Sequence, residues 1–140
     1  MIDKLNELEK NLSNLDEISL KKVPELLKSL LKDLAHDVDN YIGDFPTFIE
    51  PVHLEGPVKI GDDVLLGPNV YIGKNVEIGD YNEISNSVIF DNVRLGENMK
   101  IEDCIILKDS VIDLSDSFLK RVILSGNNKK SPETFKRIAF

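Results

Sequence analysis

The residues of this chain that could do acid–base or nucleophilic chemistry are two histidines and one cysteine. His53 stands between two apolar residues, in the order Val52-His53-Leu54, so on a strand it would point away from the side that its neighbours share. A histidine in such an outward position could serve as a general base. His36 falls in a stretch that we expect to be helical, and a solvent-exposed or helix-packing role is the simpler interpretation.

The remaining candidates are Cys104 and two pairs of carboxylates. A lone cysteine cannot form an intrachain disulfide, and a reducing cytoplasm is the expected compartment. Cys104 occupies an inward position of the repeat that begins at Val52, so we expect a buried structural thiol rather than a nucleophile. Asp62-Asp63 and the pair Asp113 and Asp116 fall at expected corners, where aspartate is a common turn former. Two histidines cannot supply a three-histidine zinc site. We expect neither a metal nor a cofactor.

Charge and hydropathy limit the partners. The formal net charge is −8, and the acidic residues are spread along the chain. Phosphate backbones and anionic membranes attract clustered Lys and Arg, so neither nucleic acid nor a membrane is an expected partner. The first residues lack the apolar core of a signal peptide, and no apolar run approaches the roughly 20 residues of a membrane span.

Residues 1–43 have a helical pattern and form the first of three predicted segments. Apolar residues recur there at steps of three or four: Ile2, Leu5, Leu8, Leu12 and Leu15. After a break near Ser19, Pro24 is acceptable as the first residue of a second helix, which Gly43 would end. Residues 44–51, with Pro46 and Pro51, are expected to form an extended connector.

Residues 52–126 form the second segment, and here the period changes. Four dipeptides of an aliphatic residue and glycine recur every six residues: Ile60-Gly61, Leu66-Gly67, Ile72-Gly73 and Ile78-Gly79. A valine stands two places before each aliphatic residue, so both side chains would point inward from a strand. Repeats of six residues are typical of a parallel β-helix. The pattern continues to Leu124 at three repeats per coil and predicts about four coils.

The alternative to a β-helix is a meander or sandwich of short strands. That arrangement needs hairpin turns, and it gives no reason for glycine to recur four times in the same phase. Residues 127–140 form the third segment, a C-terminal tail. Ser131 and Pro132 suit the start of a short capping helix, and apolar residues near the end of the tail could cover the open end of the tube.

The run from Ile60 to Gly79 resembles the hexapeptide-repeat transferases, whose domain is a left-handed β-helix. Three later runs resemble the C-terminal domains of sugar-phosphate nucleotidyltransferases: Asn86 to Gly96, Asp103 to Ile106 and Asp109 to Ile112. The left-handedness is implied by this resemblance alone, since parallel crossovers elsewhere are almost always right-handed. The expected fold is therefore mainly β, a left-handed parallel β-helix preceded by an α-helical segment.

The sequence departs from this family in one important respect. The family's catalysis takes place on a separate N-terminal nucleotide-binding domain, which carries a Gly-rich loop with Arg and Lys. No such loop occurs in this sequence, and the roughly 50 residues before the repeats are too few for an α/β nucleotide-binding domain. The resemblance therefore implies the C-terminal domain without its catalytic domain.

The outward side chains of the repeats divide into three faces. The first carries His53, Tyr71, Val88, Ile105 and Ile123; the second Lys59, Glu77, Arg94 and Val111; the third Leu65, Glu83, Lys100 and Phe118. The first face is apolar from Tyr71 onward, and a contiguous apolar stripe is seldom left in water. We therefore predict an interface at Tyr71, Val88, Ile105 and Ile123, covered by the N-terminal helices or by a neighbouring subunit.

Three hypotheses about function remain open. The first is a non-catalytic oligomerisation or regulatory module within a homo-oligomer, for which the resemblance suggests a trimer. The second is a small acyltransferase that uses acyl-CoA, with His53 as its base in a cleft at a subunit boundary; the family's projecting loop between coils is absent. The third is a subunit that docks onto a separate nucleotidyltransferase chain. An enzymatic role, if present, would be that of a transferase.

Overall fold

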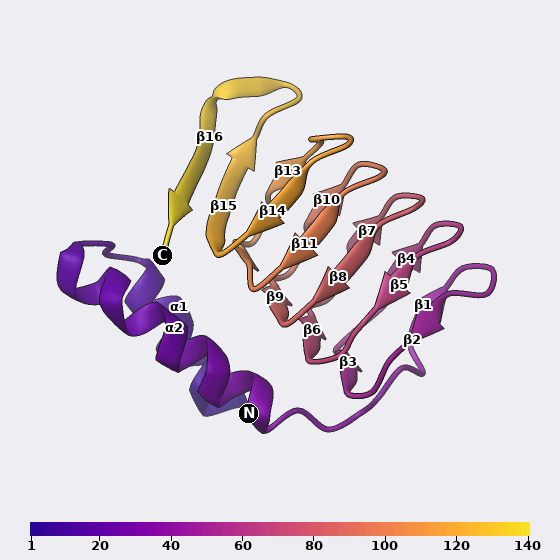
Figure 1. Cartoon of the computed structure of the whole chain (residues 1–140), viewed down its shortest axis with the longest axis horizontal. Coiled ribbons are helices and arrows are strands. Elements are labelled where there is room, and N and C mark those ends of the chain that lie inside the picture. Colours follow the sequence, from indigo (N-terminus) through magenta and orange to yellow (C-terminus); the bar gives the residue numbers. More distant parts are fainter.

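The computed structural model describes all 140 residues, and its main body is a β-solenoid with two helices along one side (Figure 1). The helices are α1 (Ile2–Leu12) and α2 (Glu17–Lys32). The strands are β1 (Tyr41–Ile42), β2 (Thr47–Phe48), β3 (Val52–Leu54), β4 (Val58–Ile60), β5 (Leu65–Leu66), β6 (Val70–Ile72), β7 (Val76–Ile78), β8 (Glu83–Ser85), β9 (Ser87–Ile89), β10 (Arg94–Leu95), β11 (Lys100–Glu102), β12 (Ile105–Ile106), β13 (Val111–Ile112), β14 (Phe118–Lys120), β15 (Val122–Asn127) and β16 (Ser131–Ala139). No helix is long and apolar enough to cross a membrane.

The strands stack in three columns of parallel neighbours. The first column holds β3, β6, β9, β12 and β15; the second β1, β4, β7, β10 and β13; the third β2, β5, β8, β11 and β14. Successive strands of the chain belong to successive columns, so the chain winds around one axis. Five strands in a column correspond to about five coils, close to the four that we predicted.

The predicted inward phase is confirmed by the strand register. Ile72 pairs with Ile89 and Ile89 pairs with Ile106, so the three side chains form one vertical stack inside the tube. All three are fully buried. Burial of one such side chain contributes roughly 1.5–3 kcal/mol before the loss of conformational entropy, and each coil achieves this burial only by stacking on the next.

The glycines of the repeat are required mainly by close contact between coils. A Cβ atom at Gly61 or Gly73 would collide with a carboxylate oxygen of the following coil, that of Asp80 or Asp91. Each of these carboxylates accepts a hydrogen bond from the backbone N–H that follows the glycine, over 2.8 Å in both cases. Glycine therefore recurs in one phase because it lets an aspartate of the next coil reach the backbone.

Most corners are formed by Asn and Asp in the left-handed region, as we predicted from their turn chemistry. The Asn and Asp residues with positive φ are Asp63, Asn69, Asn75, Asn86, Asn92, Asn98, Asp103, Asp109 and Asp116. These two residue types tolerate that conformation better than most others. Asn69 also donates its side-chain amide to Asn86 one coil later, so the corners form a polar ladder along the solenoid.

The two helices differ from the prediction at their boundaries. The second begins at Glu17, because the Asp16 carboxylate accepts a hydrogen bond from the Ser19 N–H at 2.7 Å and so forms the N-cap. Pro24 lies inside this helix, so our assignment of Pro24 as its first residue was wrong. The helix ends at Lys32 instead of Gly43.

The solenoid begins earlier than Val52. Strands β1 and β2 pair with β4 and β5, and Asp37 forms a parallel bridge with His53, so residues 37–48 form an additional first coil. The expected continuation of the second helix to Gly43 and the extended connector over residues 44–51 were therefore wrong. The backbone of this segment satisfies its hydrogen bonds on the next coil, for example from the Thr47 N–H to the Val64 carbonyl oxygen at 3.0 Å.

The C-terminal tail forms a strand, and the predicted capping helix is absent. Strand β16 pairs antiparallel with β15, whose last residue, Asn127, also pairs with Val111 of β13. The Asn127 side chain accepts hydrogen bonds from the N–H groups of Lys129 and Lys130, which fixes the intervening turn. Pairing with the open edge of β15 satisfies backbone groups that a helix would leave exposed.

Asn82 is a buried amide in an inward position that Val64 occupies in the preceding coil and Met99 in the following one. Its Nδ2 donates to the carbonyl oxygens of Gly79 at 2.9 Å and Gly96 at 2.7 Å, and its Oδ1 accepts from the Met99 N–H at 2.8 Å. The side chain thus joins two consecutive coils through backbone groups of both.

We predict that Asn82→Val lowers the free energy of unfolding by about 2–4 kcal/mol, because two carbonyl oxygens and one N–H lose their partner while the volume is nearly kept. Chemical denaturation followed by circular dichroism measures the change. Asn6→Val, on an exposed position of α1, is the control and should change stability by at most about 0.5 kcal/mol. Equal stability of the two variants would show that the amide contributes nothing.

Candidate functional site

The predicted interface residues lie in one column of the solenoid. His53 pairs with Tyr71, Tyr71 with Val88, Val88 with Ile105 and Ile105 with Ile123, each on the outward side of its strand. We call Tyr71, Val88, Ile105 and Ile123 the covered face, because none of them is more than 5% exposed.

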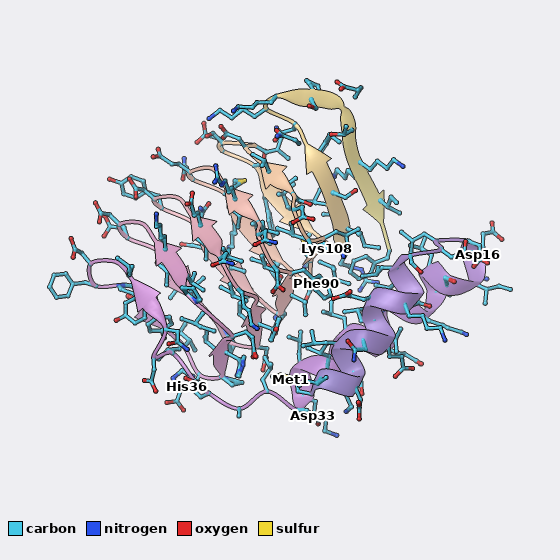
Figure 2. The ribbon with its side chains drawn as sticks, turned by 180° about the vertical axis from the view of Figure 1, so that it is seen from behind. Met1, Asp16, Asp33, His36, Phe90 and Lys108 are labelled. Atoms are coloured by element: carbon cyan, nitrogen blue, oxygen red, sulfur yellow. The ribbon has the colours of Figure 1, made fainter.

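The chain's own helices cover this face, as Figure 2 shows from behind. The apolar side chains that pack with it are Leu8, Leu12, Val23, Leu27, Leu30, Leu31 and Phe90. All of these except Phe90 lie on the two helices, at the spacing of three or four residues that places apolar side chains on one side of each helix. The two helices are joined by an ion pair between Lys4 and Asp33 and by a hydrogen bond from Asn11 to the Ser19 carbonyl. A neighbouring subunit could reach the covered face only by displacing them.

His53 is held at the margin of the covered face with both ring nitrogens in contact with acceptors. Its Nε2 lies 2.7 Å from a Glu55 carboxylate oxygen, and its Nδ1 lies 3.3 Å from the Ala35 carbonyl oxygen. Its ring stacks on Tyr71, with 5.6 Å between centroids, and its side chain is 13% exposed. A general base needs a ring nitrogen that is open to substrate, and neither nitrogen is open in this arrangement.

His36 lies between the second helix and the solenoid, in the irregular segment that follows Lys32 (labelled in Figure 2). Our placement of it in a helix was wrong. Its Nδ1 accepts a hydrogen bond from the Val52 N–H at 3.0 Å, and its Nε2 is 3.7 Å from Glu50. His36 therefore fastens the helical segment to the start of β3.

Cys104 is fully buried, and its neighbours account for both its position and its low reactivity. Its N–H donates to the Ser87 hydroxyl one coil earlier at 3.0 Å, and its Sγ lies 3.3 Å from the Leu119 carbonyl oxygen. Burial raises the pKa of the thiol, which lowers the fraction of the reactive thiolate. Burial likewise raises the pKa of the Tyr71 hydroxyl above its usual range, with a further contribution from the Glu55 charge.

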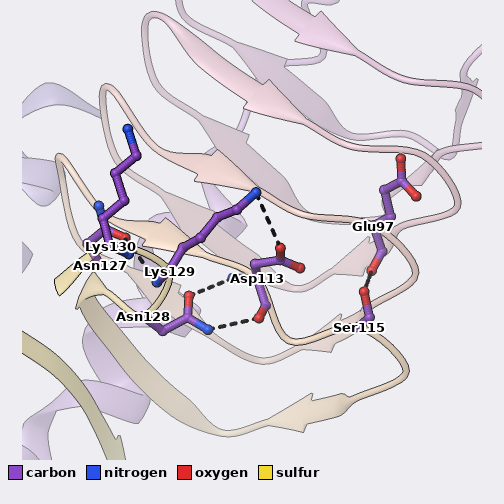
Figure 3. Close-up of polar contacts among 7 residues, drawn as sticks. All are labelled: Glu97, Asp113, Ser115, Asn127, Asn128, Lys129 and Lys130. Atoms are coloured by element: carbon purple, nitrogen blue, oxygen red, sulfur yellow. Dashed lines mark hydrogen bonds and ion pairs between the residues drawn. The ribbon is translucent and has the colours of Figure 1, made fainter. Parts of the chain in front are cut away.

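Asp113 and Asp116, at two corners, form hydrogen bonds with residues of neighbouring coils. The Asp113 N–H donates a hydrogen bond to Oδ1 of Asn128, and Nδ2 of Asn128 donates to the Asp113 carbonyl oxygen, both at 2.8 Å (Figure 3). The Asp113 carboxylate is 3.8 Å from the Lys129 ammonium. Asp116 accepts a hydrogen bond from the Asn98 amide. No group of three or more His, Cys, Asp or Glu side chains is placed to hold a metal ion.

The first coil carries exposed apolar residues that the sequence interpretation missed. Tyr41, Ile42, Phe45 and Ile49 are 37%, 70%, 94% and 45% exposed at the open end of the solenoid. We refer to these four residues as the first-coil end. They were missed because we assigned Tyr41 and Ile42 to the second helix and residues 44–51 to a connector; the apolar pair Tyr41-Ile42 beside Gly43 was the available signal.

We predict that Ile105→Glu lowers the free energy of unfolding by about 3 kcal/mol or more, because it places an unpaired carboxylate beneath the helices. Thermal and chemical unfolding measure the effect, and limited proteolysis reports release of α1 and α2. The control is Phe118→Glu, at the equivalent outward position of the third column, where the side chain is 55% exposed. Unchanged melting of Ile105→Glu would contradict the packing described here.

A family model described as the GMPPB C-terminal domain matches residues 48–134, which run from the end of β2 into β16. No curated protein matches the chain. The matched range contains the repeats that resemble nucleotidyltransferase C-terminal domains and excludes both helices. Because the match covers more than half of the residues, the chain belongs to the GMPPB C-terminal domain family.

Proposed function

We propose that this chain is a non-catalytic assembly or regulatory module built on a β-solenoid. Two observations support the absence of a catalytic role for its candidate residues. His53 has both ring nitrogens against acceptors, and Cys104 is buried with a raised pKa. A free buried thiol also fits the reducing cytoplasm, which we propose as its compartment.

We infer the assembly role from the first-coil end. The outer edges of β1 and β2 have no strand partner, because each pairs only with the strand of the following coil. On the same coil, Phe45 and Ile42 have most of their surface in water. Unpaired edges beside exposed apolar side chains favour association with another chain.

The proposed assembly is a homo-oligomer, and its subunit number depends on which surface makes the contact. Two identical first-coil ends that meet each other form a closed pair. A trimer, suggested by the family resemblance, would use the side faces instead, where Lys59 and Arg94 surround Glu77 and where Phe118 is partly exposed.

We expect the double variant Ile42→Asp/Phe45→Asp to weaken self-association by about tenfold or more, because it places charge in the proposed contact. Native mass spectrometry and light scattering over a range of concentrations measure the subunit number. The matched control is Ile2→Asp/Ile18→Asp, which changes two apolar residues that are each 68% exposed on the helices. A monomeric wild-type chain, or an oligomer that survives the first variant, would refute a contact at this end.

A second partner is proposed from family membership: a separate nucleotidyltransferase chain, onto which the solenoid would dock. Affinity purification of the native complex, followed by identification of its chains, tests this directly. The acyltransferase alternative requires His53 as a base, so His53→Ala should abolish acetyl transfer from acetyl-CoA if that activity exists. The contacts of His53 with Glu55 and Ala35 argue against it.

A further inference from the structure

A hollow of about 470 Å³ lies between α2 and the corners that precede the covered face. Its size falls within the range of roughly 300–1,000 Å³ that is usual for small-molecule sites. One wall is formed by α2, through Leu31, Lys28 and Lys32; the other is formed by the corner column Asn69, Asn86, Asp103 and Arg121.

The charge of this hollow is opposite to that of the whole chain. Three cationic side chains line it, Lys28, Lys32 and Arg121, and the only carboxylate among its lining side chains is that of Asp103. Lys28 and Lys32 are four residues apart on α2 and therefore lie on one side of the helix. Neither lysine forms an ion pair, although the chain has a net charge of −8. An anion between the two walls would relieve the repulsion among these cations.

Arg121 occupies its corner at a conformational cost. The other three members of the corner column are Asn or Asp, which tolerate the left-handed conformation, whereas Arg121 adopts the same conformation with φ 56°. Its position is fixed by a hydrogen bond from Nε to a main-chain oxygen of the last residue, Phe140, at 3.1 Å, and its guanidinium carbon lies 5.8 Å from the Phe140 ring centroid. An arginine at a strained position thus lines the same hollow as two lysines of α2.

The corner side chains supply polar groups beyond the cations. Their backbone N–H groups are used between coils, as from Asn86 to the Pro68 carbonyl oxygen at 2.9 Å, so a ligand would meet side chains only. Asn86 accepts from Asn69 at 2.9 Å, and its own amide group makes no hydrogen bond within the protein. An amide donor and the Asp103 acceptor side by side suit hydroxyl groups.

We propose that this hollow binds a small phosphorylated metabolite with hydroxyl groups, of the sugar phosphate or nucleoside monophosphate class. Lys28, Lys32 and Arg121 contact the phosphate, because two ammonium groups and one guanidinium match a dianion better than a single carboxylate. Asn86 and Asp103 contact the hydroxyl groups, and Leu31 forms part of the apolar wall. This site is independent of the proposed assembly, since one chain supplies every group.

Calorimetric titration with glucose 6-phosphate, AMP, glucose and inorganic phosphate tests the proposal. We expect saturable binding of glucose 6-phosphate or AMP, tighter than that of inorganic phosphate, and none of glucose. The compound that binds shows whether the site accepts a sugar phosphate or a nucleoside monophosphate. Failure of both phosphorylated compounds, or equal affinity for inorganic phosphate, would overturn the proposal.

The variant Lys28→Gln/Lys32→Gln should weaken that binding by about tenfold or more. Lys10→Gln/Lys22→Gln is the matched control, because it removes two positive charges from the helices at residues that do not line the hollow. Its affinity should stay within about twofold of wild type. Equal weakening of binding in both double variants would show that affinity depends only on the net charge of the chain, and would refute the site. Melting curves and native masses of both variants confirm that fold and assembly are intact, so failure of this site is distinguishable from failure of the assembly role.

Discussion

Each coil of the solenoid buries its inward side chains only because another coil lies directly above or below it. This constraint fixes the distance between coils, and the rest of the structure follows from it. Aspartates of one coil reach the backbone of the previous coil at Gly61 and Gly73, where any side chain would block them. Asn82 bridges three backbone groups across two coils in the same way. The solenoid is therefore a stack of nearest-neighbour contacts, and its two ends are the places where such contacts stop.

The two ends of the solenoid and its first face differ in whether other elements cover them. Strand β16 pairs with β15 at the last coil, and α1 and α2 cover the first face. The first coil, in contrast, leaves Ile42 and Phe45 in water. The histidines and the cysteine make structural contacts. His36 accepts a hydrogen bond from β3, and Cys104 is buried inside the solenoid. His53 contacts Glu55 and Ala35. The exposed apolar residues of the first coil and the hollow beside α2 remain open to other molecules, and the proposed assembly role and the proposed ligand site rest on them.

The sequence predicted the parts of the fold that repeat. Compact side chains two residues apart set the inward phase, and the same phase placed Tyr71, Val88 and Ile105 on one outward face. The first coil was not predicted, because Tyr41 and Ile42 also fit the apolar pattern of the preceding helix and Pro46 suggested a connector, although β1 and β2 follow the six-residue spacing. The tail was not predicted because a Ser-Pro start suits a helix locally, while pairing with the edge of β15 depends on distant residues. The hollow could not be predicted for a similar reason: Lys28 and Arg121 come to line one hollow only after α2 has packed against the corner column.

The stacked register can be measured directly by methyl NMR on protein with labelled Ile, Leu and Val. The account predicts strong nuclear Overhauser contacts from Ile89 to both Ile72 and Ile106, and from Ile105 to leucines of α2, within one chain. Spectra in which Ile72, Ile89 and Ile106 share no contacts, or in which the contacts of Ile105 arise only between chains in mixed-label samples, would contradict it.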